Sequence, residues 1–303
     1  MAPSHLEAEL RELASAFDAS IDVTTGDELL DINCGAIHAV GRAATDAPRL
    51  IDLQWGDPSH PRVTLVGKGV TFDSGGLDIK PGSGMRLMKK DMGGAATAIG
   101  LASLVMAQAL PVRLRLLIPA AENAISGNAF RPGDVLATHK GLTVEIDNTD
   151  AEGRLLLCDA LSIACEDKPD VIFDYATLTG SARSAVGTEI AAMFSNDDEL
   201  AASVSAAAGR TDDPVWRMPL HDGYRYMLDS KIADVVNSAP TPYAGAISAA
   251  LFLERFVSDA DIPWMHFDIM AFNVRDRPAH PEGGEAMALR AVYDHLQHSY
   301  GQP

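Results

Sequence analysis

The sequence predicts an α/β fold, a three-layer α/β/α domain whose mostly parallel, mixed central sheet is covered by helices on both faces. Segments of helical periodicity alternate with short apolar runs along most of the chain, which indicates buried strands joined by helices. A glycine-rich polar stretch directly follows one apolar run, at the carboxyl end of a predicted strand, where open α/β sheets place ligand sites. With 303 residues and 47% apolar residues, the chain can build a large core in one domain.

The first quarter of the chain predicts two helices and two strands. Ser4 can cap a first helix, because apolar residues recur at helical spacing from Leu6 to Phe17. A second helix is expected next, and prolines then mark the turn between two strands. These expected elements cover 26–44 (helix), 49–55 (strand) and 63–66 (strand).

The rest of the chain continues the alternation of helices and strands. Further helices are expected over 92–109, 153–165, 285–300 and from the loop at 240–246 to Val257. Further strands are expected over 112–119, 171–175 and 264–269. This order implies a sheet with helices on both faces.

The charge of the chain argues against polyanionic partners. The formal net charge is −18 and the sequence pI is about 4.7, so nucleic acid and anionic membrane surfaces would be repelled. No apolar run approaches the ~18 residues of a membrane-spanning helix, and the acidic N-terminus does not resemble a secretion signal. The cysteines form no C-x-x-C pair and lie in apolar contexts, which indicates reduced thiols and a cytoplasmic location.

Two charged stretches carry the residues best suited to chemistry. One lies among the glycines that follow the second predicted strand, and the other is a short run in the middle of the chain. Their charged residues are Lys68, Asp73, Lys80, Asp91, Asp150, Glu152 and Arg154. Four carboxylates are enough to hold two hard or borderline divalent cations. The glycines allow the backbone to approach a ligand closely, which a solvated charged surface would not need.

Taken one at a time, several of these residues have simpler explanations. Lys68 alone suits a salt bridge, because a lysine ligand must be neutral, and lowering its pKa from ~10.4 to ~7 costs roughly 4 to 5 kcal/mol. Asp73 alone could form a turn, and Asp91 could cap a helix. Asp150 and Glu152 favour a metal, because two acids in alternation would repel each other without a cation.

Other common types of site are not supported by the sequence. Gly67-Lys68-Gly69 lacks the spacing of a phosphate-binding loop. The nine histidines are dispersed, and none has the H-E-x-x-H spacing of a metal-binding helix. We therefore expect His139, His221 and His266 to be core or surface residues.

Five motifs, in order, resemble the catalytic domain of the leucyl aminopeptidase family of two-metal exopeptidases, metallopeptidase family M17. The resemblance covers about residues 5 to 270. The motifs are Val66 to Gly76, Asp91 to Ala95, Ile118 to Asn123, Asn148 to Leu155, which is the family signature, and Ala176 to Gly180. The resemblance implies a metal-dependent aminopeptidase that releases N-terminal residues from peptides.

The resemblance also implies which residues hold the metals. It implies one metal held by Lys68, Asp73, Asp91 and Glu152, and a second held by Asp73, Asp150 and Glu152. The usual ion is zinc, with manganese or magnesium at the more exchangeable position. In the family, the free α-amine binds one metal, the scissile carbonyl binds the other, and a bridging hydroxide attacks.

Two basic residues complete the catalytic set that the resemblance implies. Lys80 would stabilise the developing oxyanion, and Arg154 would hold a bicarbonate ion that shuttles the proton. Without the resemblance, each would be read as a surface ion pair.

The substrate pocket is expected around the first side chain of the peptide. By resemblance, Met88 and the turn formed by Thr177, Leu178 and Gly180 border this side chain, although Met88 alone would suit the core. Near the C-terminus, the family's usual segment is replaced by Asp268 to Pro278, so Met270 and Asn273 could narrow the pocket or make it more polar. Leucine preference should therefore not be assumed from the resemblance. Alternatively, Met270 and Phe272 simply pack in the core.

The resemblance also bears on domains and assembly. Family members carry a separate N-terminal domain that we expect to be absent here, with residues 1–24 as an entry helix and linker and residues 25–303 as the catalytic domain. A homo-hexamer is the family's usual assembly. Two alternatives are a two-metal phosphoesterase, which Lys68 as an amine-site ligand disfavours, and a non-catalytic DNA-binding role, which the net charge disfavours.

Overall fold

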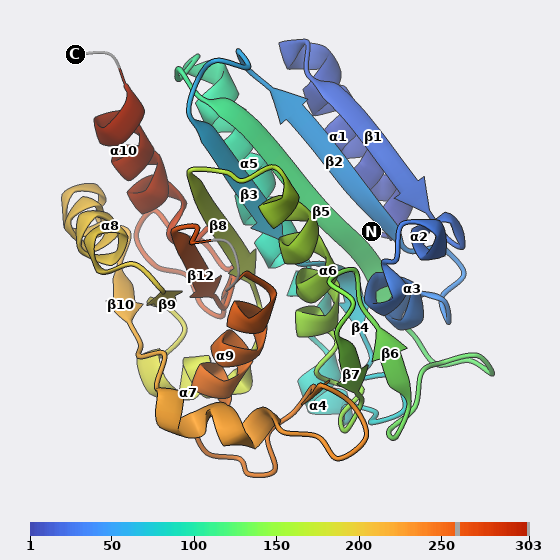
Figure 1. Ribbon diagram of the computed structural model, residues 1–303. Coiled ribbons are helices and arrows are strands. Elements are labelled where there is room, and N and C mark those ends of the chain that lie inside the picture. The colour runs from blue at the N-terminus through green and yellow to red at the C-terminus, as the bar shows by residue number, and fades with distance from the viewer. Residues whose placement is uncertain (258–260, 302–303) are drawn as a thin grey trace.

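The computed structural model describes residues 1–257 and 261–301, and it confirms the predicted α/β architecture (Figure 1). Within these residues, a mixed nine-stranded sheet has the order β1-β2-β5-β3-β8-β12-β9-β10, with β4 also paired to β5. Most neighbouring pairs are parallel. The antiparallel pairs are β1 with β2, β2 with β5, and β12 with β9.

The strands of the main sheet include all those that the sequence predicted. They are β1 (Ser20–Thr25), β2 (Arg49–Trp55), β3 (Arg62–Gly67), β4 (Gly69–Asp73), β5 (Arg113–Asn123), β8 (Val171–Ala176), β9 (Ala191–Ser195), β10 (Val215–Arg217) and β12 (Trp264–Asp268). Two smaller sheets contain β6 (Val135–Ala137), β7 (Thr143–Glu145) and β11 (Val235–Val236), and β13 (Phe272–Asn273) and β14 (Gly283–Gly284).

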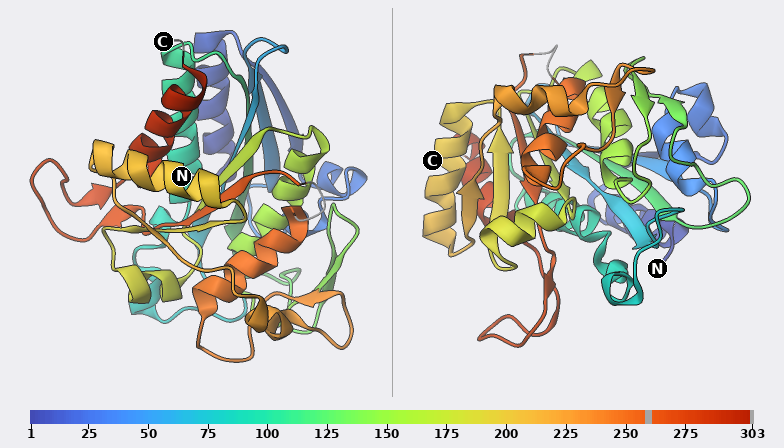
Figure 2. Two further views of the ribbon diagram at one scale, coloured as in Figure 1. Left: turned by 60° about the vertical axis from the view of Figure 1, so that its left-hand side comes forward. Right: turned by 90° about the horizontal axis from the view of Figure 1, so that it is seen from below.

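Helices cover both faces of the sheet (Figures 1 and 2). One hydrophobic core is shared with α1 (Pro3–Phe17), α5 (Gly93–Ala107), α8 (Asp198–Thr211) and α10 (Leu289–Tyr300). A second is shared with α3 (Gly35–Gly41), α6 (Gly153–Glu166) and α9 (Gly245–Val257). Shorter segments are α2 (Glu28–Asp31), α4 (Gly82–Met85), α7 (Gly180–Val186) and the 3-10 helices η1 (Met88–Lys90) and η2 (Asp222–Leu228).

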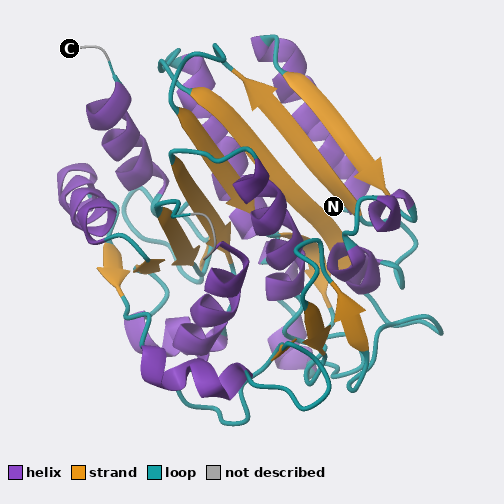
Figure 3. Cartoon of the chain, in the orientation of Figure 1, coloured by secondary structure: helices purple, strands orange, loops and turns teal. Residues whose placement is uncertain are grey.

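The apolar runs form central strands because both of their faces are buried. In β5, Leu114 and Leu116 pack into the core that contains α5, while Leu117 and Ala121 pack into the core that contains α6. Successive side chains of a strand point to opposite faces, so a continuous apolar run serves both cores. Figure 3 shows the resulting layers, with helices in front of and behind the strands.

The single helix predicted over 26–44 is wrong, because this segment forms two short helices, α2 and α3. Asn33 between them has a left-handed backbone with φ +58°, which ends a helix. The segment then restarts at Gly35, where a Cβ atom would lie 2.4 Å from the carbonyl oxygen of Ala137. Close contact with a distant strand therefore overrides the helical periodicity.

The C-terminal helix begins later than the sequence predicted, at Leu289 instead of Glu285. Ala288 has a left-handed backbone with φ +59°. The carboxylate of Asp213 accepts hydrogen bonds from the backbone N–H groups of Ala288, Arg290 and Ala291, at 2.9, 2.8 and 3.1 Å. The N-terminus of α10 is thus capped by a residue that is distant in sequence.

The N-terminal segment is joined to the rest of the domain. Leu6 and Leu10 of α1 are buried in the core that contains α5, and β1 pairs with β2 from Ser20 to Thr25. The division expected after residue 24 therefore falls inside β1. Among the described residues, no helix combines the length and the apolar character needed to cross a membrane.

Candidate active site

The candidate site lies where β3, β4 and β8 end, at the edge of the sheet where open α/β folds place ligands. Lys68 connects β3 to β4, and its backbone N–H donates to the carbonyl of Tyr175 on β8 at 2.9 Å. Its own carbonyl accepts from the N–H of Ala95 in the first turn of α5, also at 2.9 Å. Two neighbouring elements therefore fix the backbone of Lys68.

Three carboxylates converge around the Lys68 side chain. Asp73, Asp91 and Glu152 are each at most 2% exposed, and one oxygen from each lies within 4.8 Å of the others. Lys68 Nζ lies 2.8 Å from Asp91 Oδ2 and 2.8 Å from Glu152 Oε1. The residues come from the end of β4, the end of η1 and the start of α6, so the fold brings together positions that are far apart in sequence.

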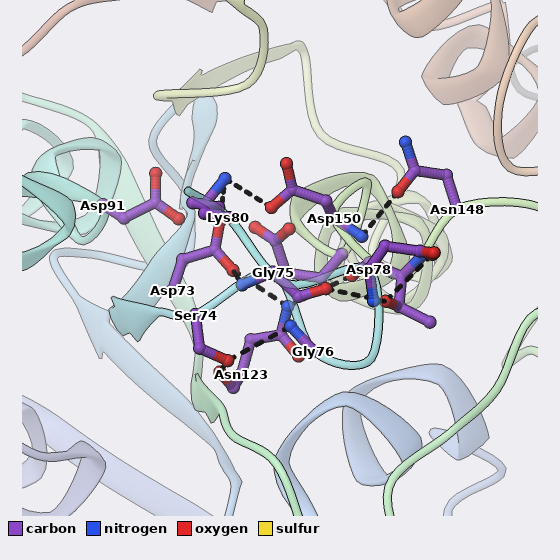
Figure 4. A network of polar contacts seen from close by, with 12 residues as sticks. Asp73, Ser74, Gly75, Gly76, Asp78, Lys80, Asp91, Asn123, Asn148 and Asp150 are labelled. Atoms are coloured by element: carbon purple, nitrogen blue, oxygen red, sulfur yellow. Dashed lines mark hydrogen bonds and ion pairs between the residues drawn. The ribbon is translucent and has the colours of Figure 1, made fainter. Parts of the chain in front are cut away.

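A second lysine faces the outer side of the same cluster. Lys80 Nζ lies 2.9 Å from Asp73 Oδ2 and also contacts Asp150 Oδ1 (Figure 4). Asp73 is therefore shared between the acids that surround Lys68 and the acids that contact Lys80. Asp150 is the most exposed of the four acids, with 32% of its side chain accessible.

The electrostatics of the cluster show an excess of negative charge. Burial, together with the negative charge of the nearby Asp73, raises the pKa of Glu152 to about 8 against the opposing charge of Lys68. Burial raises the pKa of Asp150 to about 6, although Lys80 opposes this. Burial disfavours the charged form of Lys68, but Asp91 and Glu152 outweigh it and raise the lysine pKa. Additional positive charge would stabilise these carboxylates.

The residues fit divalent cations. Asp91 Oδ2 and Glu152 Oε1 are buried and, among the described residues, accept no hydrogen bond of regular geometry, although the Lys68 ammonium faces them. Buried carboxylate oxygens are ligands that hard cations prefer, and a bound cation would also lower the pKa of the lysine amine.

A polar network locks the glycine-rich loop to the Asn148 to Arg154 stretch (Figure 4). Asn123 Nδ2 donates to Asp73 Oδ1 at 2.9 Å and to the carbonyl of Thr149 at 3.1 Å. Asp78 Oδ2 accepts from the backbone N–H of Thr149 at 2.7 Å. Gly75, with φ +89°, allows the tight turn, because a Cβ there would lie 2.5 Å from the Asp78 carbonyl oxygen. The network fixes the positions of Asp73 and Asp150 relative to each other.

Arg154 is buried near Glu152 and does not belong to the residues that line the cleft. It is 7% exposed, and its Nε and Nη1 have no hydrogen-bond acceptor among the described residues. The guanidinium lies 5.9 Å from the ring centre of Phe252. Burial lowers its pKa to about 10, against the opposing charge of Glu152. A buried guanidinium with free donors suits an anion.

The turn after β8 is held against the site by Asp268, which ends β12. Asp268 Oδ1 accepts from the backbone N–H groups of Leu178 and Thr179 at 2.9 and 3.1 Å, and its Oδ2 accepts from the Thr179 hydroxyl at 2.6 Å. Thr177 Oγ1 donates to Asp91 Oδ1 at 2.7 Å. The turn is therefore tied both to the sheet and to a candidate ligand.

A cleft of about 230 Å³ opens over the acids. Its walls contain most of the residues that the sequence singled out. They are Lys68, Asp73, Lys80, Met88, Lys90, Asp91, Asp150, Glu152, Thr177, Leu178, Thr179, Gly180 and Arg183.

Met270 and Asn273 are not brought to this cleft. Met270 is buried in the core that contains α5 and α10. Asn273 lies on β13, where its Nδ2 donates to the carbonyl of Pro281 at 3.2 Å and contacts Glu285. The packing of Met270 corresponds to the core alternative that the sequence left open.

Several residues that organise the site carried little signal of their own. Asn123 closes the third motif, but its contacts with Asp73 and Thr149 depend on the pairing of β4 with β5. Asp268 also lies in a segment that departs from the family pattern. Lys90 and Arg183 also line the cleft, but neither belongs to the ligand sets that the motifs imply.

The histidines singled out by the sequence lie away from the acid cluster. His266 is buried, with Nδ1 2.5 Å from Asp174 Oδ1. His139 pairs with Glu166 at 2.9 Å, and His221 packs edge-on against Tyr224.

Comparisons with known proteins point to one family. Residues 1–293 match the model of the cytosol aminopeptidase family, catalytic domain. A probable cytosol aminopeptidase from Geobacter sp. (strain M21) is 42% identical over 299 residues, which is 97% of this chain and 60% of that protein. The chain therefore spans less than two thirds of the length of this relative.

Solved structures agree with the sequence comparison. The crystal structure of cytosol aminopeptidase from Coxiella burnetii has a TM-score of 0.96 and 56% identity, covering 99% of this chain and 65% of that chain. The bottromycin maturation enzyme BotP in complex with Mn has a TM-score of 0.93 and 40% identity, covering 98% of this chain and 66% of that chain.

Proposed function

Since the chain belongs to the cytosol aminopeptidase family, as its motifs predicted, we propose that it is a metal-dependent aminopeptidase that releases N-terminal amino acids from peptides. The observation that carries this proposal is the buried cluster of Asp73, Asp91 and Glu152 around Lys68, which opens into a cleft. An ion-pair network at the surface would not be buried in this way.

Five residues would hold two divalent cations. Lys68, Asp73, Asp91 and Glu152 would hold one, and Asp73, Asp150 and Glu152 the other. When bound, such cations supply the positive charge that makes water a reactive nucleophile near neutral pH and polarises a carbonyl. We expect zinc, with manganese or magnesium at the Asp150 position, because oxygen ligands tolerate all three ions.

The remaining groups would bind the substrate or assist its hydrolysis. Lys80 is 15% exposed in the cleft and can donate a hydrogen bond to the oxygen that gains negative charge when the peptide carbonyl is attacked. Arg154 presents two free donors and would hold a small anion such as bicarbonate, which can accept and return a proton. Met88 and the turn from Thr177 to Gly180 would border the first side chain of the substrate.

We further propose the family's assembly and location for the whole protein. The expected assembly is a homo-hexamer, and the expected location is the cytoplasm. Native mass spectrometry of the purified chain would show the assembly, and a monomer would contradict it.

Hydrolysis of leucyl p-nitroanilide, combined with elemental analysis, tests the proposed activity. We expect activity that chelation abolishes and that zinc or manganese restores. Glu152→Gln should lose metal and activity together, because it removes a buried ligand oxygen. The matched control Glu199→Gln changes an exposed acid on α8 and should retain both. A chain that binds metal but hydrolyses no aminoacyl substrate would contradict the proposal.

A further inference from the structure

Two basic side chains that the proposed catalytic set does not use line the active-site cleft. Lys90 is the last residue of η1, next to Asp91. Arg183 lies on α7, in the turn of helix that follows Gly180. The two residues come from segments that are far apart in sequence, so the fold has placed both cations in the same small cavity.

Within the part of the chain that the structure describes, Lys90 and Arg183 lack the close carboxylate partners that neutralise Lys68 and Lys80. Lys68 and Lys80 each contact two carboxylates. Lys90 meets Asp91 Oδ1 only at 4.0 Å, although just 2% of its side chain is exposed. Among the described residues, the Arg183 guanidinium has neither an ion pair nor a hydrogen bond. A buried ammonium without a close partner is costly, so the cleft is prepared for an anionic group.

The two cations also flank the elements expected to border the first side chain of a peptide. Met88 begins η1, the short helix that Lys90 ends. A Cβ atom on Gly180 would lie 3.6 Å from Arg183 Nη2, so the guanidinium stands directly over the turn. An anion held by both residues would therefore lie beside that side-chain position.

We propose that Lys90 and Arg183 recognise a carboxylate on the N-terminal side chain of the substrate, so that the enzyme favours peptides that begin with aspartate or glutamate. The proposal deepens the proposed aminopeptidase function and rests on it. A guanidinium presents paired N–H donors that match a carboxylate, and an ammonium adds a third charge-assisted hydrogen bond. An apolar side chain at this position would leave both cations without partners.

The C-terminal carboxylate of a dipeptide has the same chemistry as an acidic side chain. We favour the side chain because Lys90 and Arg183 adjoin Met88 and Gly180. A comparison of leucylglycine with leucylglycine amide separates the two sources, because only the first has a free C-terminal carboxylate.

The test compares kcat/KM for glutamyl and leucyl p-nitroanilides with the metal-loaded full chain. Arg183→Met and Lys90→Met should each lower the glutamyl-to-leucyl ratio by about tenfold or more, the effect of losing one charge-assisted hydrogen bond. Arg183→Glu should shift preference toward lysyl p-nitroanilide. Because the readout is a ratio measured on one enzyme, partial loss of folding or metal cancels. Arg183 is half-buried, so its variants are expected to fold. They still test the proposal if Lys90→Met misfolds.

Lys89→Met is the matched control. Lys89 is the exposed neighbour of Lys90, and its Nζ lies 5.9 Å from the ring centre of Phe272, away from the cleft. Its glutamyl-to-leucyl ratio should match that of the unmodified chain.

Each outcome discriminates between the proposals. Hydrolysis of the leucyl substrate with a ratio that neither Arg183→Met nor Lys90→Met changes would overturn the carboxylate proposal and leave the aminopeptidase function standing. The variants could instead lose activity on leucylglycine but not on leucylglycine amide, with an unchanged glutamyl-to-leucyl ratio. That result would place the C-terminal carboxylate at these cations and would also overturn the proposal. Failure to hydrolyse any aminoacyl substrate would instead refute the proposed function.

Discussion

Gly153 shows how a single residue without a side chain shapes the candidate metal centre. It follows Glu152 at the start of α6, and a Cβ atom there would lie 2.6 Å from Lys68 Cε and 2.7 Å from Lys68 Nζ. The lysine cannot easily move aside, because its ammonium is held by Asp91 and Glu152. The glycine therefore makes room for a candidate ligand.

Gly153→Ala should displace the Lys68 amine and weaken metal binding by about tenfold or more, as changes beside metal ligands commonly do. Titration of the chelated chain with zinc measures this. Gly209→Ala is the control, because Gly209 also lies in a helix, α8, and a Cβ there meets no atom within 4 Å. Equal zinc affinity in the two variants would show that the contact with Lys68 is unimportant.

Lys80→Met should lower kcat by about 100-fold or more, because removing a donor to a developing oxyanion has this effect in other hydrolases. Metal content should persist, since none of the proposed ligands changes. Measurements of kcat and of bound metal on the same sample check both statements. A variant with full kcat would remove Lys80 from the catalytic set.

At the residue scale, the motifs were enough to predict which acids lie close together. Asp73, Asp91 and Glu152 were predicted to act together, and the structure brings their oxygens within 4.8 Å of one another. The partners that orient the site could not be predicted, because Asn123 and Asp268 reach it only through strand pairing. Local sequence contains no record of such pairing.

At the scale of elements, Asp159 joins two helices of one layer. Its carboxylate lies on α6 and accepts hydrogen bonds from the backbone N–H groups of Ala36 and Ile37 in the first turn of α3, both at 3.0 Å, and of His139 at 2.8 Å. Burial raises the pKa of this carboxyl to about 7, although these three hydrogen bonds oppose the shift.

The raised pKa of Asp159 predicts a pH-dependent stability. Between its ordinary value of 3.8 and about 7, the folded state binds more protons at this carboxyl than the unfolded state does, so the free energy of unfolding falls as the pH rises through this range. From about pH 5.5 to about pH 8, the loss from this carboxyl is about 2 kcal/mol. Urea unfolding of the chain and of Asp159→Asn should therefore differ by an amount that changes with pH. Asp198→Asn, at an exposed acid on α8, should show a constant difference.

Elements were predicted well where their burial is regular and poorly where distant residues decide their ends. The expected strand at 49–55 coincides with β2, where apolar residues alternate with polar ones. The expected strand at 171–175 nearly coincides with β8, whose residues are all buried. The helix expected over 26–44 is broken by the contact of Gly35 with Ala137. The start of α10 depends on Asp213, 75 residues before Ala288.

At the scale of the whole molecule, the acid cluster predicts that metal removal weakens the fold. Ions that bind only the folded state stabilise it by about 2.7 kcal/mol at a free concentration 100 times Kd. Chelation should therefore lower the Tm, and added zinc or manganese should restore it. Glu152→Gln should respond less, because it removes an oxygen shared by both proposed sites. A Tm that is insensitive to chelation in a metal-loaded sample would contradict this expectation.

The link between Lys68 and Tyr175 has a consequence for synthesis on the ribosome. All five proposed ligands lie between residues 68 and 152, but the backbone of Lys68 is held by the carbonyl of Tyr175 on β8. A nascent chain that has not yet released β8 from the exit tunnel carries every proposed ligand without the strand that positions the first. We therefore expect the complete five-ligand arrangement to form only after β8 has emerged and paired with β3.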